Sequence, residues 1–246
     1  IQSLIDEAEF AFANTIDSED VACFIAECVQ GEGGFIPQPA KYLKAIKDLC
    51  EKYGILYIAD EIQSGFCRTG KFFAIEHMGF NPDIMTIAKS MADGMPLAAT
   101  LVKSELDKVR PGQLGGTYMG NAVACAASCA AVDAFKSFDF CGRAVEIGNY
   151  IKSRVEKMMS KHAQIGDFRG LGAMCAMEIV EDPKTKKPGA KLLAQIIKEC
   201  NKRGMLVLSC GMRGNNMRFL PPLVITDEQL AQAMDILEEA CDVVLD

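Results

Sequence analysis

Two short apolar runs, each followed by a charged residue, constrain the fold more than any other feature of the chain. The first run, Gly54-Ile-Leu-Tyr-Ile-Ala, precedes Asp60, and the second, Asp83-Ile-Met-Thr-Ile-Ala, precedes Lys89. Runs of this length and composition are typical of the buried strands of parallel α/β sheets. Such sheets bind ligands outside the carboxyl ends of their strands. The sequence therefore predicts that Asp60 and Lys89 face one crevice.

An acid and an amine in one crevice have a specific chemical use. A desolvated lysine loses some preference for its charged form and can attack a carbonyl to form a Schiff base. A nearby carboxylate can keep a pyridinium nitrogen protonated, which makes the ring of pyridoxal phosphate an electron sink. The alternative, which the spacing alone favours, is that Asp60 caps a helix and Lys89 is simply solvated.

Composition excludes several classes of partner. The 246 residues are 50% hydrophobic and 24% charged, which is enough to bury a sizeable core in one or two domains. The net charge of -7 and the lack of a basic run argue against nucleic acid or an anionic membrane. No apolar stretch approaches the roughly 20 residues that span a bilayer, and the acidic start of the chain does not resemble a secretory signal. We therefore expect a cytoplasmic protein.

The cysteines do not form a metal-binding pattern. There are eleven of them, an odd number, and they form no CxxC pair, so we expect reduced and mostly buried thiols. Cys125 and Cys129 lie four residues apart on an expected helix and could share a metal. The two histidines, His77 and His162, are remote from them in sequence, so we predict no metal site.

Periodicity and turn residues predict the other elements. Strands are expected at 21–29, 54–59, 83–88, 96–102, 173–180, 205–209 and 216–222, and helices at 37–53, 71–79, 121–135, 144–162 and 190–203. The helix at 121–135 is rich in small residues, which predicts tight packing. Gly166–Gly172 is expected to be a turn, and Thr226 with Gln229 predicts a capping box for a last helix.

Three motifs occur in order along the chain. They are Ile58-Ala-Asp-Glu-Ile-Gln-Ser-Gly-Phe-Cys-Arg-Thr-Gly70, Pro82-Asp-Ile-Met-Thr-Ile-Ala-Lys-Ser90 and Gly115-Gly-Thr-Tyr-Met-Gly-Asn121. Each resembles a signature of the class III pyridoxal-phosphate aminotransferases, most of all of the members that act on 4-aminobutyrate. The resemblance implies an α/β, aspartate-aminotransferase-like fold (fold type I). Residues 1–138 would be the C-terminal part of the large, mostly parallel-sheet domain, and residues 139–246 a small C-terminal α+β domain.

The same resemblance implies the cofactor, pyridoxal phosphate, and the residues that hold it. Lys89 matches the Schiff-base lysine and Asp60 the acid at the ring nitrogen. Ile62 matches the residue that packs on the ring face, although without the motif it would be assigned to core packing, and Gln63 matches the residue that bonds the ring hydroxyl. Thr117 matches a threonine that contacts the cofactor phosphate of the neighbouring subunit. This last match implies a homodimer or a dimer of dimers with shared active sites.

Substrate binding is predicted at Glu32 and Arg218. Glu32, in a glycine-rich loop, is either an exposed turn acid or a carboxylate in the site. Arg218 would usually be a surface charge, but its apolar neighbours favour a bidentate carboxylate partner. In the family, the matching glutamate pairs with the arginine that binds the substrate carboxylate, and it releases the arginine to a dicarboxylic substrate. Arg68 and Arg169 are assigned no role in the site.

The implied reaction is transamination of an ω-amino acid, 4-aminobutyrate foremost, with 2-oxoglutarate to give a semialdehyde and glutamate. Lys89 would act as the general base and acid. Other class III donors remain open, namely 5-aminovalerate, ornithine and acetylornithine, whereas Glu32 with Arg218 argues against an aminomutase. Family chains also extend N-terminal to residue 1, and that part supplies a phosphate loop and a ring-stacking aromatic. A truncated, inactive fragment that only dimerises or folds on a partner therefore remains a second hypothesis.

Overall fold

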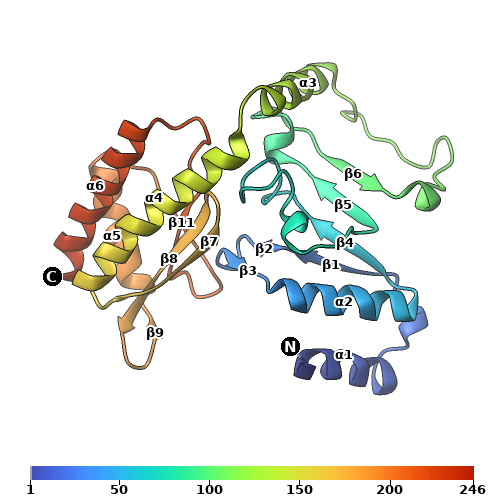
Figure 1. The fold of residues 1–246 in the computed structure, drawn as a ribbon, viewed down its shortest axis with the longest axis horizontal. Helices are drawn as coiled ribbons and strands as arrows, with labels where there is room; N and C mark the ends of the chain where they lie inside the picture. The colour runs from blue at the N-terminus through green and yellow to red at the C-terminus, as the bar shows by residue number, and fades with distance from the viewer. Residues whose placement is uncertain (1) are drawn as a thin grey trace. The chain divides into compact units, whose positions relative to one another are not determined.

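The computed structural model describes residues 2–246 and divides into two units (Figure 1). Unit 1 comprises the described part of Ile1–Cys28 together with Gln38–Phe66 and Lys71–Asp139, and unit 2 comprises Val29–Pro37, Cys67–Gly70 and Phe140–Asp246. The predicted domains, 1–138 and 139–246, do not anticipate the two short early segments that pack with unit 2. Each unit is described below on its own.

Unit 1 is built on a four-stranded sheet. The strands lie in the order β1 (Cys23–Glu27), β4 (Leu56–Asp60), β5 (Ile84–Ile87) and β6 (Ala99–Val102). The first three are parallel, and β6 runs antiparallel to β5. The mostly parallel sheet expected from the apolar runs is therefore confirmed.

Helix α2 (Ala40–Tyr53) covers one face of this sheet, and α1 (Gln2–Asn14) lies beside α2 (Figure 1). Leu43 and Ile46 of α2 are buried in one core cluster with Tyr57 and Ala59 of β4. Successive residues of a strand point to opposite faces. Because Tyr57 and Ala59 face the helix, Asp60 points to the other face of the sheet.

The remaining elements of unit 1 are four 3-10 helices and α3 (Ala122–Ser137). The 3-10 helices are η1 (Ser18–Asp20), η2 (Ala74–His77), η3 (Lys89–Met91) and η4 (Ser104–Leu106). Asn121 caps α3, since its Oδ1 accepts hydrogen bonds from the backbone amides of Val123 and Ala124, both at 3.1 Å. The buried residues of α3 are Ala124 and Ser128. The prediction of a tightly packed helix is wrong for the described residues, because small side chains by themselves do not indicate burial.

Unit 2 contains an antiparallel sheet covered on one face by helices (Figure 1). Its strands lie in the order β10 (Leu208–Cys210), β11 (Asn216–Phe219), β8 (Met174–Asp182) and β7 (Ile165–Leu171), with β9 (Lys187–Pro188) paired to β8. The helices are α4 (Phe140–Lys161), α5 (Ala190–Lys202) and α6 (Asp227–Leu245). The early segment Val29–Pro37 adds a small hairpin of β2 (Val29–Gln30) and β3 (Ile36–Pro37). The expected small α+β part is confirmed, and the capping box of Thr226 with Gln229 begins α6.

The turn predicted for residues 166–172 is wrong, because most of this segment belongs to β7. Its glycines permit close strand contact instead of chain reversal. A Cβ atom on Gly170 would lie 2.3 Å from the Met174 carbonyl oxygen of β8, and the φ angle of Gly170 is 144°. Only glycine tolerates both the backbone angle and the approach.

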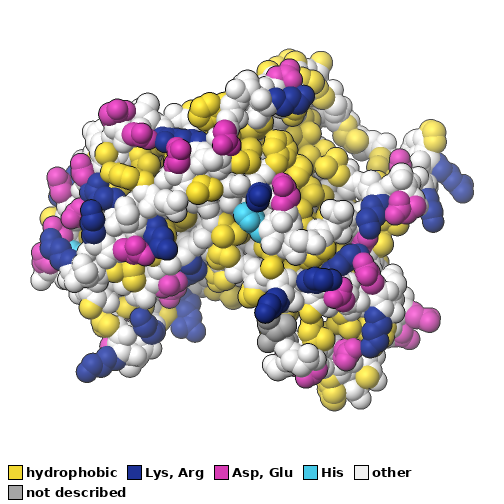
Figure 2. Space-filling model, viewed as in Figure 1, with side chains coloured by type: hydrophobic (Ala, Val, Ile, Leu, Met, Phe, Trp, Pro, Cys, Tyr) yellow, Lys and Arg dark blue, Asp and Glu magenta, His cyan; other side chains and the backbone are white. Residues whose placement is uncertain are grey.

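The surface of unit 2 carries charges of both signs. Arg154 of α4 pairs with Asp235 at 2.7 Å and with Glu238 at 3.0 Å on α6, and Lys161 pairs with Asp242 at 2.6 Å. Figure 2 shows basic and acidic side chains interspersed over these helices. No disulfide joins the cysteines within residues 2–246, and most of their side chains are buried. Within residues 2–246, no helix is both long enough and apolar enough to cross a membrane.

A buried ion cluster connects α2 to the sheet of unit 1. Asp83, which is 8% exposed, accepts hydrogen bonds from Lys47 at 2.8 Å, from Lys103 at 2.7 Å and from the Tyr57 amide at 2.9 Å. Burial alone would raise the pKa of Asp83, but these donors outweigh burial and lower the pKa to about 2. The carboxylate therefore stabilises the folded chain when it is ionised.

Asp83→Asn is expected to destabilise the chain by about 3 kcal/mol at pH 7, because it leaves the exposed Glu51, at 3.2 Å, as the remaining charge partner of the buried Lys47 ammonium. The folded-state pKa lies below the ordinary carboxyl value, so the stabilisation by Asp83 is present above pH ~4 and is lost as the pH falls towards 2. Urea unfolding at pH 7, 5, 4 and 3 measures this difference.

Asp48→Asn is the matched control, since Asp48 pairs with Lys44 at 3.0 Å and both side chains are exposed. It is expected to cost less than about 0.5 kcal/mol. An Asp83→Asn effect that stayed constant between pH 7 and 3 would show that ionisation of Asp83 is irrelevant to stability.

Candidate active site

The register of β4 and β5 brings two predicted site residues to one edge of the sheet. Asp60, the last residue of β4, is paired with Thr86 of β5, and the Glu61 amide donates to the Thr86 carbonyl oxygen at 2.9 Å. Lys89 follows Thr86 by three positions, just beyond the end of β5. Because the two strands are parallel, Asp60 and Lys89 leave the sheet at the same edge. No ion pair joins them within residues 2–246.

The backbone at Lys89 has an uncommon conformation. Its φ angle is 50°, in the left-handed region, and it is the first residue of η3. For a residue with a side chain, this conformation costs about 1–2 kcal/mol. Strained residues of this kind cluster at functional sites. The Lys89 side chain is exposed, so its amine is accessible.

Asp60 is oriented by the residues that follow it. Its Oδ1 accepts a hydrogen bond from the Ile62 amide at 3.0 Å. Asp60, Ile62 and Gln63 are all half-buried. The turn after β4 therefore places the two predicted ring-contacting residues directly beside the carboxylate.

Glu61 organises this turn, and the sequence analysis assigned it no function. Its carboxylate is completely buried and accepts hydrogen bonds from Ser64 Oγ at 2.6 Å and from the amides of Ala74 and Ile75 at 3.0 and 2.7 Å. Burial raises the pKa of Glu61, and these donors offset part of the shift. Glu61 thus fastens the start of η2 to the end of β4. Its position next to Asp60 was the one sequence feature that could have indicated a role for Glu61. The backbone amides that it binds cannot be recognised from the sequence.

Thr117 lies in the exposed segment 107–121, and within residues 2–246 no hydrogen bond joins it to Asp60 or Lys89. Thr86 is different: its Oγ1 is buried and has no hydrogen-bond partner within residues 2–246. Thr86 and Asp60 are partners in a parallel pair, so their side chains point to the same face of the sheet. The residues that carry an amine, a carboxylate and an unpaired hydroxyl therefore lie at one edge of the sheet. These groups fit the aldehyde, ring nitrogen and polar substituents of pyridoxal phosphate.

The other predicted pair lies within unit 2. Glu32 is in the loop between β2 and β3, Arg218 is on β11, and Arg218 Nη1 donates to Glu32 Oε1. The Glu32 side chain is 72% exposed, whereas that of Arg218 is 18% exposed. The structure brings these two residues together, and their role in substrate binding stays a prediction.

Arg68 makes a structural contact. Its Nη1 donates to the Pro221 carbonyl oxygen at 2.6 Å, and burial lowers the pKa of the guanidinium to about 10. This contact fits the expected structural loop residue, and the absence of a role in the site stays a prediction.

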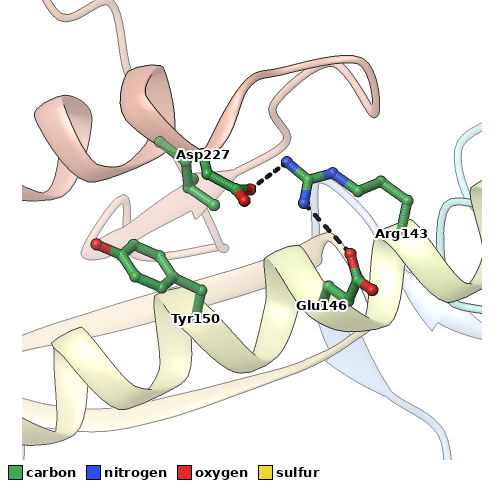
Figure 3. A pocket seen from close by; sticks show the side chains of 5 residues that line it. Arg143, Glu146, Tyr150 and Asp227 are labelled. Atoms are coloured by element: carbon green, nitrogen blue, oxygen red, sulfur yellow. Dashed lines mark hydrogen bonds and ion pairs between the residues drawn. The ribbon is translucent and has the colours of Figure 1, made fainter.

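A hollow of about 410 Å³ on unit 2 contains none of the predicted site residues (Figure 3). It is lined by Arg143, Glu146, Tyr150, Asp227 and Leu230. Arg143 pairs with Asp227 at 2.8 Å and with Glu146 at 3.3 Å, so these charges already have partners. In the part of the chain that the structure describes, no cluster of His, Cys, Asp or Glu is arranged to hold a metal.

Comparison with known proteins decides the family. The model of the family described as aminotransferase class-III matches residues 2–241. The chain belongs to the class III aminotransferases. It is 43% identical over 232 residues to the 4-aminobutyrate aminotransferase of Escherichia coli, which covers 94% of this chain and 54% of that protein. It is 42% identical over 240 residues to a 5-aminovalerate aminotransferase of Pseudomonas putida, which covers 97% of this chain and 56% of the relative.

The fold agrees with this class III membership. An amine transaminase from an uncultivated Pseudomonas species, solved with pyridoxal phosphate bound, superposes with a TM-score of 0.89 at 32% identity. The match covers 98% of this chain and 56% of that structure. The expected aspartate-aminotransferase-like fold is therefore confirmed. The chain spans about half of the length of the relatives that it matches.

Glu61→Gln is expected to destabilise unit 1 by about 1–3 kcal/mol, because the amide nitrogen of Gln cannot accept a hydrogen bond from a buried donor. Thermal or urea unfolding of the purified chain measures the loss. Amide hydrogen exchange at Ala74 and Ile75 is expected to accelerate in parallel.

Glu76→Gln is the control. Glu76 lies in η2, the short helix that Glu61 binds, and its exposed side chain accepts a hydrogen bond from the Phe73 amide at 2.8 Å. Gln can replace Glu at this capping position, so little change is expected. Equal losses for the two variants would contradict the role assigned to Glu61.

Proposed function

We propose that the protein containing this chain is a pyridoxal-phosphate-dependent aminotransferase. It would transfer the amino group of an ω-amino acid, 4-aminobutyrate foremost, to 2-oxoglutarate, giving a semialdehyde and glutamate. The observation that carries the proposal is the common sheet edge of Asp60 and Lys89 in a class III chain. The left-handed backbone of Lys89 supports it, because such a conformation is retained where a side chain must be aimed.

In this proposal each residue of unit 1 has a stated task. Pyridoxal phosphate, when bound, supplies an aldehyde and a ring that withdraws electrons from the substrate carbon. Lys89 Nζ holds the aldehyde carbon and, once displaced by the substrate amine, takes a proton from the substrate carbon and later returns one. Asp60 holds a proton at the ring nitrogen, while Ile62 contacts the ring and Gln63 bonds its hydroxyl.

Unit 2 supplies the proposed selection of substrates. Arg218 binds a substrate carboxylate, and Glu32 neutralises Arg218 when the substrate has no second carboxylate. The exposure of Glu32 supports this role, because a water-accessible partner can be displaced at low cost. A donor such as 5-aminovalerate is the second candidate, since the relatives named for 4-aminobutyrate and 5-aminovalerate are 43% and 42% identical to this chain.

A second copy of the chain is part of the proposal. Thr117 would contact the cofactor phosphate of the other subunit, in a dimer or a dimer of dimers. Leu114, Tyr118 and Met119 support such a contact, since these apolar side chains beside Thr117 are 69%, 84% and 66% exposed. A cytoplasmic location likewise stays a prediction, which rests on composition.

Lys89→Ala in the intact protein is expected to abolish covalent retention of pyridoxal phosphate and to lower kcat by roughly 10²–10⁴-fold or more. Borohydride reduction followed by peptide mass spectrometry reports the covalent link. Labelling of the peptide that contains Lys89 is expected in the unsubstituted protein.

Lys41→Ala is the control, because Lys41 is an exposed lysine of α2. It should keep both the label and the activity. Labelling of another lysine, or no label in the intact protein, would refute the assignment of Lys89 and would favour the hypothesis of a non-catalytic fragment.

A further inference from the structure

Two arginines flank one alanine on the sheet of unit 2. Ala176 of β8 is paired with Arg218 of β11 on one side and with Arg169 of β7 on the other. Paired residues of antiparallel strands project from the same face. Ala176 is fully buried, and its methyl group is too short to separate the two arginines. The sheet therefore presents two cations on one face, with the small side chain of Ala176 between them.

The β2–β3 hairpin, Val29–Pro37, packs on Ala176. Phe35 is fully buried in a cluster with Met174 and Ala176. The Gly211 amide donates to the Glu32 carbonyl oxygen at 2.9 Å, and Arg169 Nε donates to the Gly34 carbonyl oxygen at 3.0 Å. One arginine thus holds the backbone of the loop, while Arg218 holds the carboxylate of Glu32.

The surroundings of Arg169 make it a fixed anchor. Besides Gly34, it donates to Asp167 and Glu178 through Nη1 and to Asn216 through Nη2, each at 2.7 Å. Burial lowers the pKa of Arg169, but its bonds with Asp167 and Glu178 outweigh burial and raise it. By contrast, the Glu32 carboxylate that meets Arg218 is 72% exposed. The contact of Arg169 with the Gly34 carbonyl oxygen is therefore stabilised by a network of hydrogen bonds. The contact of Arg218 with the Glu32 carboxylate can be displaced by another carboxylate.

The space around Gly34 matches this arrangement. A Cβ atom there would lie 3.2 Å from Arg169 Nη2 and 3.3 Å from Asn216 Nδ2, and the φ angle of Gly34 is 128°. A side chain would therefore crowd the guanidinium and strain the loop. Glycine allows the carbonyl oxygen to reach Arg169.

We propose that Arg169 is a positioning residue that keeps Glu32 poised over Arg218, and so sets how strongly a dicarboxylate must compete for Arg218. The proposal rests on the substrate-selecting roles proposed above for Glu32 and Arg218. A tethered carboxylate competes according to its effective concentration, which falls when its tether becomes mobile. Loss of the Arg169 anchor therefore weakens the internal competitor without removing it. The expected consequence is tighter binding of dicarboxylates.

The test uses Arg169→Met in the intact protein, with glutarate as the probe. Glutarate is a dicarboxylate without an amino or keto group, so its Kd can be measured by calorimetry in the absence of turnover. Glu32→Gln is expected to tighten glutarate binding by about tenfold, and Arg169→Met by about three- to tenfold. The double variant is expected to bind no more tightly than Glu32→Gln, because both changes act on one contact. Butyrate, a monocarboxylate, is expected to lack this pattern.

Two further variants separate positioning from general damage to the fold. Arg169→Lys keeps a charge for Asp167 and Glu178 but cannot also bond Gly34 and Asn216, so an intermediate tightening is expected. It also serves as the test variant if Arg169→Met does not fold. Arg154→Met removes another arginine of unit 2 that is similarly buried and pairs with two carboxylates. It is expected to lower the unfolding temperature and to leave glutarate binding unchanged.

The outcomes distinguish this inference from the proposed function. Non-additive tightening by Glu32→Gln and Arg169→Met supports positioning by Arg169. Tightening by Glu32→Gln alone overturns the role of Arg169 and leaves that of Glu32 intact. No effect of Glu32→Gln overturns the proposed competition between Glu32 and the substrate, and the role of Arg169 with it.

Discussion

The parallel pairing of β4 with β5 is the constraint on which the proposed chemistry depends. It aligns Asp60 with Thr86 and so delivers the residues after both strands, Lys89 among them, to one edge of the sheet. A shift of one residue would turn Asp60 towards α2 and into the apolar core. The burial of Tyr57 and Ala59 against α2 opposes that shift, because each would have to exchange places with a side chain of the opposite face. Core packing thus fixes where the acid and the amine emerge.

A second constraint is that the backbone of the β2–β3 hairpin is held firmly in unit 2, whereas the Glu32 side chain on it is not. The β2–β3 hairpin is held by Phe35 in the core and by Arg169 at Gly34, while Glu32 remains exposed. A loop that is firmly held can present a weakly held carboxylate reproducibly. Selection between substrates requires this combination, because a loose loop would not compete and a buried ion pair would not release.

The parts of the fold that depend on long apolar runs could be predicted from the sequence. The strands that end near Asp60 and Lys89 were identified because a buried parallel strand leaves a continuous apolar run. The strand β7 was missed, because Gly166 and Gly170 indicate turns unless the close approach of β8 is known. The exposure of α3 was missed for a related reason, since small residues occur both in tight interfaces and on open surfaces.

The candidate site shows the same limit. Glu32 and Arg218 could be paired through a family resemblance, but Glu61 and Arg169 could not be assigned. Their partners are backbone groups and network side chains that are distant in sequence: Glu61 meets Ala74 and Ile75, and Arg169 meets Gly34. Almost every residue type has these backbone groups, so the sequence does not show which of them will bind Glu61 or Arg169. These contacts become visible only when the chain is folded.

The assignment of Val29–Pro37 to unit 2 has a consequence for how the chain could be divided. A polypeptide that starts at Phe140 would carry β7, β8 and β11 but lack Phe35, which covers Met174 and Ala176. Its sheet would expose apolar surface, and Arg169 and Arg218 would lose their contacts with Gly34 and Glu32. Residues 140–246 are therefore not expected to fold as an independent domain. A gene fusion made at this boundary would give a protein that aggregates unless another chain supplied the missing hairpin.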